Sequence, residues 1–158
     1  CFVVDDDYRE FLTEFAPEKI KNMTEGKITD EEGEIVGEHS GYINYTIGQR
    51  RGLGLSFPEP RYVKKILPNE NKIIVSKKNS LLSNSCNLSK INWMKEIILP
   101  LKCKVRIRYN SKGASAKLYK IENNIICEFD EPQLAVTPGQ SMVFYEENSI
   151  IGGGIIEE

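Results

Sequence analysis

The chain has 158 residues, of which 40% are hydrophobic and 28% charged, an ordinary composition for a globular protein large enough to bury a core. No apolar run reaches the roughly 18 residues of a membrane-spanning helix, so we expect no membrane association. The four cysteines lack CxxC spacing and there is one histidine, which argues against a metal site and favours a reducing, cytoplasmic location.

The net charge of -2 conceals three blocks of opposite sign. Residues 1–40 contain 4 Lys or Arg and 12 Asp or Glu, residues 41–120 contain 17 and 3, and residues 121–158 contain none and 8. A middle block with this excess of cations is typical of nucleic-acid binding. The alternative is that the three blocks neutralise one another in the folded protein.

The first elements are a helix and a hairpin. Tyr8, Phe11, Leu12 and Phe15 have the spacing of one helix face and precede Pro17, which predicts a short amphipathic helix over residues 8–15. Two strand-like stretches, 26–29 and 34–37, flank a turn that contains Gly33, which predicts a hairpin. A further strand is predicted through residues 42–45. The chain begins at Cys1 without an initiator Met, and we expect it to be part of a longer protein.

A loop over residues 45–55 combines three glycines with adjacent arginines, Arg50 and Arg51. Glycine frees the backbone for tight turns, and the planar guanidinium group suits phosphate or carboxylate. The loop is therefore a candidate site for an anionic partner. The alternative is that both arginines pair with acidic residues of the chain itself.

The segment Phe57–Pro60 resembles a linker, because two prolines in three residues disfavour both helix and central strand. We therefore expect a domain boundary there, with one domain over residues 1–60 and another over 61–158. Short strands at regular spacing are predicted beyond it, over 62–67, 72–76, 85–92, 101–109, 115–121, 125–129, 141–145 and 150–157. This pattern predicts a small β-barrel or sandwich.

The strand over residues 101–109 alternates cations with apolar residues. Its cationic face holds Lys102, Lys104, Arg106 and Arg108, and its apolar face holds Cys103, Val105, Ile107 and Tyr109. A half-buried strand normally carries polar residues outward, but a row of one sign repels itself. We therefore favour a polyanion as the partner of this face, with Lys112, Lys117 and Lys120 extending it.

Further features have structural or binding interpretations. Thr137-Pro138-Gly139-Gln140 predicts a turn with Gln140 at a strand entrance, and Gly152-Gly153-Gly154 predicts a bulge or close backbone contact. His39 is interpreted as a turn hydrogen-bonder and Trp93 as a core residue. No phosphate-binding loop of the GxxxxGK[ST] or GxGxxG type is present.

Several motifs occur in one order along the whole chain. They are Cys1-Phe2-Val3, Gly37-x-His39-x-Gly41, Tyr45-Thr46-Ile47-Gly48-Gln49-Arg50-Arg51-Gly52-Leu53-Gly54, Arg108-Tyr109, Phe129-Asp130-Glu131-Pro132, Ala135-Val136-Thr137-Pro138-Gly139-Gln140 and Gly152-Gly153-Gly154. With this set the chain resembles the carboxy-terminal half of the tRNA-specific 2-thiouridylases, formerly called tRNA methyltransferases. The resemblance implies a mainly β fold: a small central β-rich domain with one short helix, then a terminal six-stranded β-barrel similar to an elongation factor domain.

The resemblance also implies an activity. The full enzymes use ATP and magnesium to adenylate the C2 oxygen of the wobble uridine in tRNAs for Lys, Glu and Gln, and a cysteine persulfide, charged by a sulfur-relay donor protein, then delivers sulfur. The family's persulfide cysteine falls on Cys1, with a disulfide bond among its implied features, and its tRNA contacts fall on Arg108, Tyr109 and Gln140. Its amino-terminal ATP pyrophosphatase domain is absent from this chain, so we expect the chain alone to be inactive and to hold no cofactor.

Two other functions remain open on the residues alone. One is a stand-alone RNA-binding β-barrel without catalysis, in which Cys1 has no chemical role. The other is a protein-interaction module whose charge blocks pair internally. RNA retention that depends on Lys104 and Arg108 distinguishes the first from the second.

Overall fold

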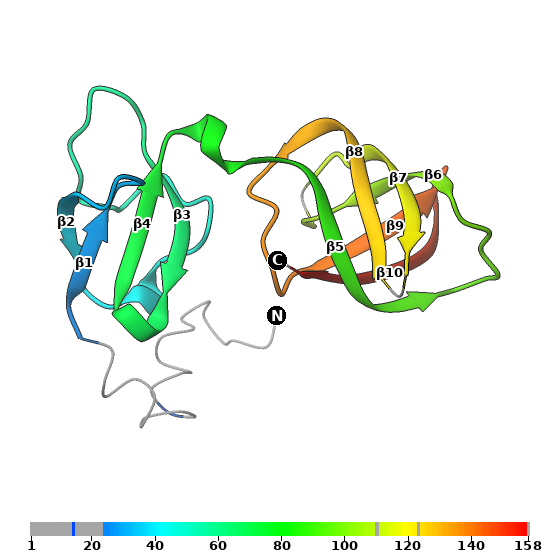
Figure 1. Cartoon of the computed structure of the whole chain (residues 1–158), viewed down its shortest axis with the longest axis horizontal. Helices are drawn as coiled ribbons and strands as arrows, with labels where there is room; N and C mark the ends of the chain where they lie inside the picture. Colours follow the sequence, from blue (N-terminus) through cyan, green and yellow to red (C-terminus); the bar gives the residue numbers. More distant parts are fainter. Residues whose placement is uncertain (1–13, 15–23, 110, 123, 158) are drawn as a thin grey trace. The chain divides into compact units, whose positions relative to one another are not determined.

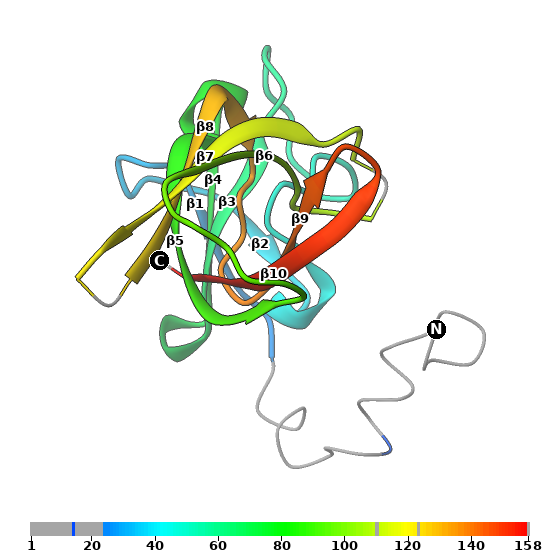
Figure 2. The ribbon, with the colours of Figure 1, turned by 90° about the vertical axis from the view of Figure 1, so that its right-hand side faces the viewer.

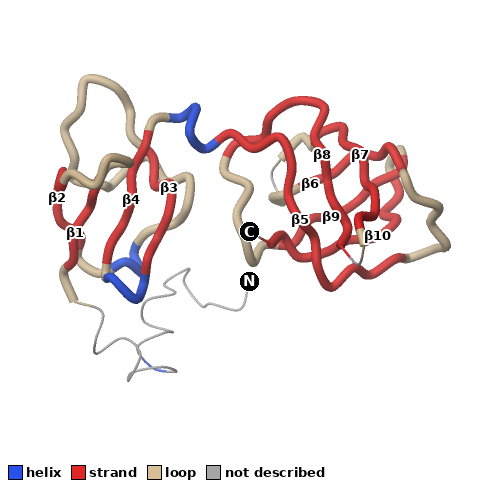
Figure 3. Tube along the Cα trace, in the orientation of Figure 1, coloured by secondary structure: helices blue, strands red, loops and turns tan. Residues whose placement is uncertain are grey.

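A computed structural model describes Glu14 and residues 24–109, 111–122 and 124–157. Apart from Glu14, the predicted helix over residues 8–15 lies outside the described residues, as does Cys1. The chain divides into two compact units, Cys1–Ser80 and Leu81–Glu158 (Figure 1). Both units consist mainly of strands (Figure 3). Three short 3-10 turns lie between successive strands: η2 (Tyr42–Asn44), η3 (Pro68–Glu70) and η4 (Lys78–Leu81).

The first unit contains a four-stranded sheet in the order β2-β1-β4-β3. Its strands are β1 (Gly26–Thr29), β2 (Ile35–His39), β3 (Tyr62–Leu67) and β4 (Lys72–Ser76), and only the β1–β4 pair is parallel. The predicted hairpin is confirmed: Gly33 has a φ of 91° in its turn, and the Asp30 carboxylate accepts from the main-chain N–H groups of Glu32 and Glu34. Ile28, Val63, Ile73 and Val75 form the fully buried centre of this unit.

The boundary between the units lies after Ser80, not at the predicted position near Pro60. The reason is the pairing of β4, which lies between β1 and β3 and binds β1 in parallel register, Ile28 opposite Ile73. The Phe57–Pro60 segment is therefore a connection within the first unit. Proline density marked a loop correctly but could not reveal a long-range parallel pair.

The strand predicted through residues 42–45 is wrong, because this stretch forms the 3-10 turn η2. The N–H groups of Asn44 and Tyr45 return to the carbonyl oxygens of Gly41 and Tyr42 at 3.1 Å each, and Asn44 Nδ2 donates to the Ser40 carbonyl. These local bonds compete with strand pairing. The turn still directs Tyr42 and Tyr45 toward the core of the unit.

The second unit is a closed six-stranded antiparallel barrel, as predicted (Figure 2). Its strands are β5 (Leu82–Trp93), β6 (Leu101–Arg106), β7 (Ala114–Ile121), β8 (Asn124–Leu134), β9 (Ser141–Glu146) and β10 (Ser149–Glu157), in the order β10-β5-β8-β7-β6-β9. Closure leaves no unpaired sheet edge among the described strands of this unit. No helix in the described part of the chain is long and apolar enough to cross a membrane.

The barrel interior is packed with apolar side chains, with Phe144, Leu118 and Met142 fully buried. Trp93 packs against this core with its ring 5.2 Å from that of Phe144, which confirms the core interpretation. The predicted close approach at the triple glycine is also confirmed. A Cβ on Gly152 would lie 2.7 Å from the Asn92 carbonyl oxygen, and one on Gly153 would lie 2.8 Å from that of Met142.

Candidate nucleic-acid interface

The outer face of β6 carries exposed Lys102 and Lys104 and half-buried Arg106, while Val105 between them is buried. The predicted alternation is therefore confirmed through Arg106. Among the described residues, no ion pair involves Lys102, Lys104 or Arg106. By contrast, Lys95 of the same unit lies 2.5 Å from the Glu146 carboxylate.

Cross-strand neighbours do little to neutralise this face. Lys102 lies directly opposite Lys117 of β7, so two like charges face each other. Glu128 of β8 lies on the other side of Lys117 and offsets part of that repulsion. Lys104 lies between two uncharged partners, Ser115 and Tyr145.

Arg106 is stacked on an aromatic ring. Its guanidinium carbon lies 5.0 Å from the centroid of Tyr145 on the neighbouring strand β9. Its Nε is buried and has no hydrogen-bond partner within the described part of the chain. The ring therefore holds the guanidinium by a cation–π contact, and the terminal nitrogens form no hydrogen bond within the described residues. Alternation in the sequence identified Arg106 but gave no sign of Tyr145.

Strand β6 ends at Arg106, so Arg108 and Tyr109 lie in a turn and not on the predicted strand. Ser111 closes this turn by donating its N–H and its hydroxyl to the Arg108 carbonyl at 3.1 and 2.9 Å. Tyr109 consequently leaves the apolar face on which period-2 alternation placed it, and it is 95% exposed. An aromatic ring this exposed is suited to stacking on an unpaired base.

The loop that leads to Gln140 is bound to Arg108. Arg108 Nη2 donates to the Ala135 carbonyl oxygen at 3.0 Å, and the Thr137 hydroxyl donates to the same oxygen at 2.9 Å. Gln140 is half-buried; its N–H reaches the Thr137 carbonyl at 3.3 Å, and its carbonyl accepts from Ile156 N at 2.9 Å. Arg108 and Tyr109 thus follow the end of β6, and Gln140 precedes the start of β9, the strand on which Val143 lies opposite Arg106. That all three predicted residues, with Lys104 and Arg106, form one binding site stays a prediction. We call these five residues the basic edge.

The glycine loop, residues 45–55, forms a second basic feature in the first unit. Arg50 and Arg51 are exposed, and no ion pair in the described ranges includes either one. The Gln49 side chain accepts from Thr46 N at 3.0 Å and donates to the Arg51 carbonyl at 2.9 Å, which fixes the loop. The alternative in which these arginines pair with the chain's own carboxylates finds no support here.

His39 is a structural hydrogen-bonder, as interpreted. It is 2% exposed; Nδ1 accepts from Gly41 N at 3.1 Å, and Nε2 lies 3.2 Å from the Asn71 carbonyl oxygen. Because Nδ1 accepts, the proton is assigned to Nε2, which donates to Asn71. Both ring nitrogens are therefore engaged, one with the turn that follows β2 and the other with the residue that precedes β4.

The three described cysteines, Cys86, Cys103 and Cys127, are free thiols in the barrel. Cys86 and Cys127 are cross-strand partners; the hydrogen bond between them, together with burial, raises the pKa of Cys127. Burial raises the pKa of Cys103 to about 11. The thiols of Cys103 and Cys127 are therefore poor nucleophiles at neutral pH. The described residues also contain no cluster of three or more His, Cys, Asp or Glu that could hold a metal ion.

Two family models match the chain in succession. The tRNA methyl transferase PRC-barrel domain matches residues 9–77, and the aminomethyltransferase β-barrel domain matches residues 83–156. The junction of the two models coincides with the division between the two units.

The chain is also similar to curated proteins over nearly its whole length. It is 41% identical to tRNA-specific 2-thiouridylase MnmA 1 of Clostridium tetani over 99% of the chain, and 44% identical to MnmA of Halothermothrix orenii over 100%. MnmA of Chlorobium phaeobacteroides is 41% identical over 100%. The matches span 43–45% of the length of these relatives. With both domain models matched in order, the chain belongs to the tRNA-specific 2-thiouridylase family.

Proposed function

We propose that this chain is the tRNA-binding part of a tRNA 2-thiouridylase, an enzyme that puts sulfur at C2 of the wobble uridine. The observation that carries the proposal is the position of Arg108, bound to the Ala135 carbonyl beside exposed Tyr109 and the loop of Gln140. The names of its relatives supply the substrate class. The expected substrates are tRNAs for Lys, Glu and Gln.

Each residue of the basic edge has a distinct role in this proposal. Lys104 and Arg106 neutralise phosphates, because neither forms an ion pair within the described residues. Tyr109 stacks on an unpaired base, and the Gln140 amide is available for a base edge or a sugar hydroxyl. Arg108 presents its remaining guanidinium nitrogens from a position fixed by Ala135. Phosphate contacts supply affinity, and Tyr109 favours non-duplex RNA.

The sulfur chemistry is assigned to Cys1 and to parts outside this chain. Cys1 would carry the persulfide, after charging by a sulfur-relay donor protein. Its terminal sulfur would attack the activated C2 and displace AMP, and a thiol outside this chain would then cleave the S–S bond, forming a disulfide with Cys1 and leaving the sulfur on the uridine. ATP and magnesium do not fit the residues at hand: the sequence lacks a phosphate-binding loop, and the described residues lack a metal-ligand cluster. Activation of the uridine would therefore fall to a separate ATP pyrophosphatase domain. On this proposal the chain alone is inactive.

Binding of an unmodified tRNA transcript at several KCl concentrations tests the proposal. We expect Arg108→Ala to weaken binding about 5- to 10-fold. It should also reduce the salt slope, the steepness with which the logarithm of the binding constant falls with the logarithm of the KCl concentration, by about 0.7–0.9 for each phosphate that it leaves without a cation. Lys104→Ala should behave similarly. Lys95→Ala is the matched control, because Lys95 belongs to the same unit but is paired with Glu146. If Arg108→Ala and Lys104→Ala bind tRNA as tightly as the control Lys95→Ala does, the basic edge is not the RNA site.

A stand-alone RNA-binding barrel without sulfur chemistry is the second candidate, since Cys1 lies outside the described residues. Treatment with inorganic polysulfide, followed by peptide mass spectrometry, separates the two. If Cys1 is the sulfur carrier, it gains one sulfur atom readily, whereas Cys103 and Cys127 stay unmodified because their raised pKa values keep both thiols protonated. Modification of Cys1 no faster than that of the buried thiols would favour the barrel without catalysis.

A further inference from the structure

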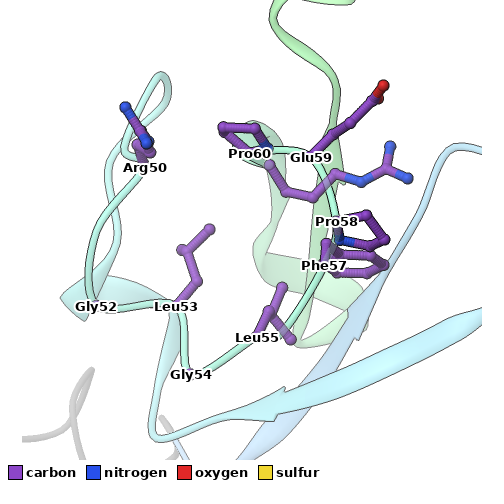
Figure 4. Close-up of a pocket in the computed structure, with 10 residues that line it drawn as sticks. Arg50, Gly52, Leu53, Gly54, Leu55, Phe57, Pro58, Glu59 and Pro60 are labelled. Carbon is purple, nitrogen blue, oxygen red and sulfur yellow. The ribbon is translucent and has the colours of Figure 1, made fainter.

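The first unit contains an open hollow that the barrel's role in RNA binding leaves unexplained. One wall is the glycine loop from Arg50 to Leu55, and the other is the segment from Phe57 to Arg61 (Figure 4). Its volume is about 310 Å³, at the lower end of the range for small-ligand sites. A single nucleotide is the scale of group that such a space accommodates.

The glycine loop reaches this hollow on a fixed backbone. Gly48 N donates to the Val63 carbonyl at 2.8 Å, and Val63 N donates to the Gln49 carbonyl at 2.9 Å, so the start of the loop is pinned to β3. Leu53, which is 6% exposed, anchors the far side of the loop in the core. The backbone that carries Arg50 is therefore set before any ligand arrives, which lowers the entropic cost of ordering the loop on binding.

Arg61 is fixed on the opposite wall. Its guanidinium carbon lies 4.8 Å from the centroid of the Phe57 ring, and its Nε is buried without a partner in the described part of the chain. Arg106 on Tyr145 repeats this arrangement in the barrel. In both cases the guanidinium carbon lies over an aromatic ring, and no hydrogen bond in the described part of the chain uses a terminal nitrogen of either arginine. Arginine planes of this kind stack on unpaired RNA bases.

The charge of the hollow favours an anion. Its one acidic lining residue, Glu59, lies 2.7 Å from Lys77, and the hydrogen bond from Lys77 lowers the pKa of Glu59. Glu59 is thus already paired with Lys77. Arg61 also attracts Glu59 and Glu31 but forms no ion pair in the described part of the chain, and Arg50 has no acidic partner there. A second hollow, which shares Glu59 and Pro60 with the first, is lined by Lys77 and Lys78. Because Lys77 is paired with Glu59, Lys78 is the cation that a polynucleotide strand leaving the first hollow would meet.

We infer that this hollow binds one unstacked nucleotide of the tRNA, with a phosphate at Arg50 and the base against the open face of the Arg61 guanidinium. The inference rests on the proposed function, which makes tRNA the polyanion that the chain meets. A protein carboxylate would satisfy the two charges but would use neither the stacked plane nor the volume between the walls. The site is separate from the basic edge and belongs to the other unit.

The test measures tRNA binding by the full chain with substitutions on each wall. Arg50→Ala should weaken binding about 3- to 10-fold and lower the salt slope by about 0.7, the value for one phosphate of single-stranded nucleic acid. Phe57→Leu keeps the apolar bulk but removes the ring, and should weaken binding about 5-fold with little change in slope. Arg61→Lys retains the charge without the planar group, so it should weaken binding nearly as much as Arg61→Ala.

Lys27→Ala is the matched control, since it removes one exposed positive charge from the same unit, where Lys27 pairs with Glu38. Ultraviolet cross-linking of the unaltered chain to tRNA, with mapping of the cross-linked peptide, does not depend on how variants fold. We expect a cross-link within residues 50–61. A single-stranded oligonucleotide should compete for it, and a duplex of equal length should not.

The outcomes separate this inference from the proposed function. If Arg108→Ala weakens binding while Arg50→Ala and Arg61→Ala match Lys27→Ala, and no cross-link maps to residues 50–61, the hollow is not an RNA site and the basic edge stands. If, in addition, Arg108→Ala and Lys104→Ala leave tRNA binding unchanged, both the inference and the proposed function fail. Competition by duplex RNA as effective as that by single strands would contradict the unstacked nucleotide.

Discussion

The Arg108 guanidinium and the Ala135 carbonyl oxygen are joined by a 3.0 Å hydrogen bond across 27 positions of sequence. Ala135 is buried and has a φ of 53°, in the left-handed region that non-glycine residues rarely adopt. That conformation turns the chain after β8, and its carbonyl receives both Arg108 and the Thr137 hydroxyl. The bond therefore couples the turn that exposes Tyr109 to the loop that leads to Gln140.

We predict that Thr137→Val weakens this coupling while preserving side-chain shape. The variant removes one of the two donors to the Ala135 carbonyl, which should lower the free energy of unfolding of the barrel by about 1 kcal/mol. RNA affinity should fall only about 2- to 3-fold, because Arg108 still reaches Ala135. Denaturant unfolding and tRNA binding check the two effects. Unchanged stability would show that the hydroxyl does not support the loop.

The ring beneath Arg106 gives a prediction that separates stacking from charge. Tyr145→Leu should weaken tRNA binding about 3-fold, because the guanidinium loses the surface that holds its plane. The salt slope should stay the same, since no cation is removed. Tyr145→Phe, which keeps the ring, is the control and should bind like the unaltered chain. A slope reduced by Tyr145→Leu would indicate that Arg106 had moved away from its phosphate.

Local pattern was sufficient to predict much of the barrel. Alternation in β6 placed Lys104 and Arg106 outside and Val105 inside, because strand geometry has a period of two residues. The same rule failed at Tyr109, since the chain leaves the strand after Arg106 and alternation no longer applies. A turn closed by Ser111 on the Arg108 carbonyl carries no apolar signature in the sequence.

The parts that sequence could not predict depend on distant pairing. Because β4 pairs in parallel with β1, the first unit extends to Ser80, beyond the predicted boundary. No feature of the sequence near Pro58 or Pro60 indicates that pairing. The same limit applies to Arg61. Its contact with Phe57 and its place in the lining of the same hollow as Arg50 depend on how the chain folds back between the glycine loop and β3. Arginine spacing alone indicated a basic loop but not the second wall of the hollow.

Because the triple glycine is closely packed, we predict that replacing Gly152 by alanine destabilises the barrel substantially. Gly152→Ala would bring a methyl group to 2.7 Å from the Asn92 carbonyl oxygen and from the Trp93 ring, both on β5. We expect the barrel to lose about 1–3 kcal/mol of stability. Gly154→Ala should cost less, because its nearest neighbour is the flexible end of the Ile91 side chain. The single tryptophan, Trp93, reports barrel unfolding by fluorescence in both variants. Equal stability of the two variants would contradict this packing account.

The buried thiol of Cys103 predicts how barrel stability depends on alkaline pH. Burial raises its pKa from 9.0 to about 11, so the folded chain holds this proton more tightly than the unfolded chain does. The resulting stabilisation is complete below about pH 9 and disappears as the pH rises toward about 11. Because Cys103 is only partly buried, we expect a loss on the order of 1 kcal/mol.

Urea unfolding of the unaltered chain and of Cys103→Ala, measured across that pH range, isolates this contribution, because every other titratable group is present in both proteins. The unaltered chain should lose more stability than the variant between about pH 9 and about pH 11. Parallel pH profiles would mean that the thiolate forms as easily in the folded barrel as in the unfolded chain. In that case Cys103 would be as reactive as an exposed thiol, and it could no longer serve as the unreactive reference against which persulfide formation on Cys1 is judged.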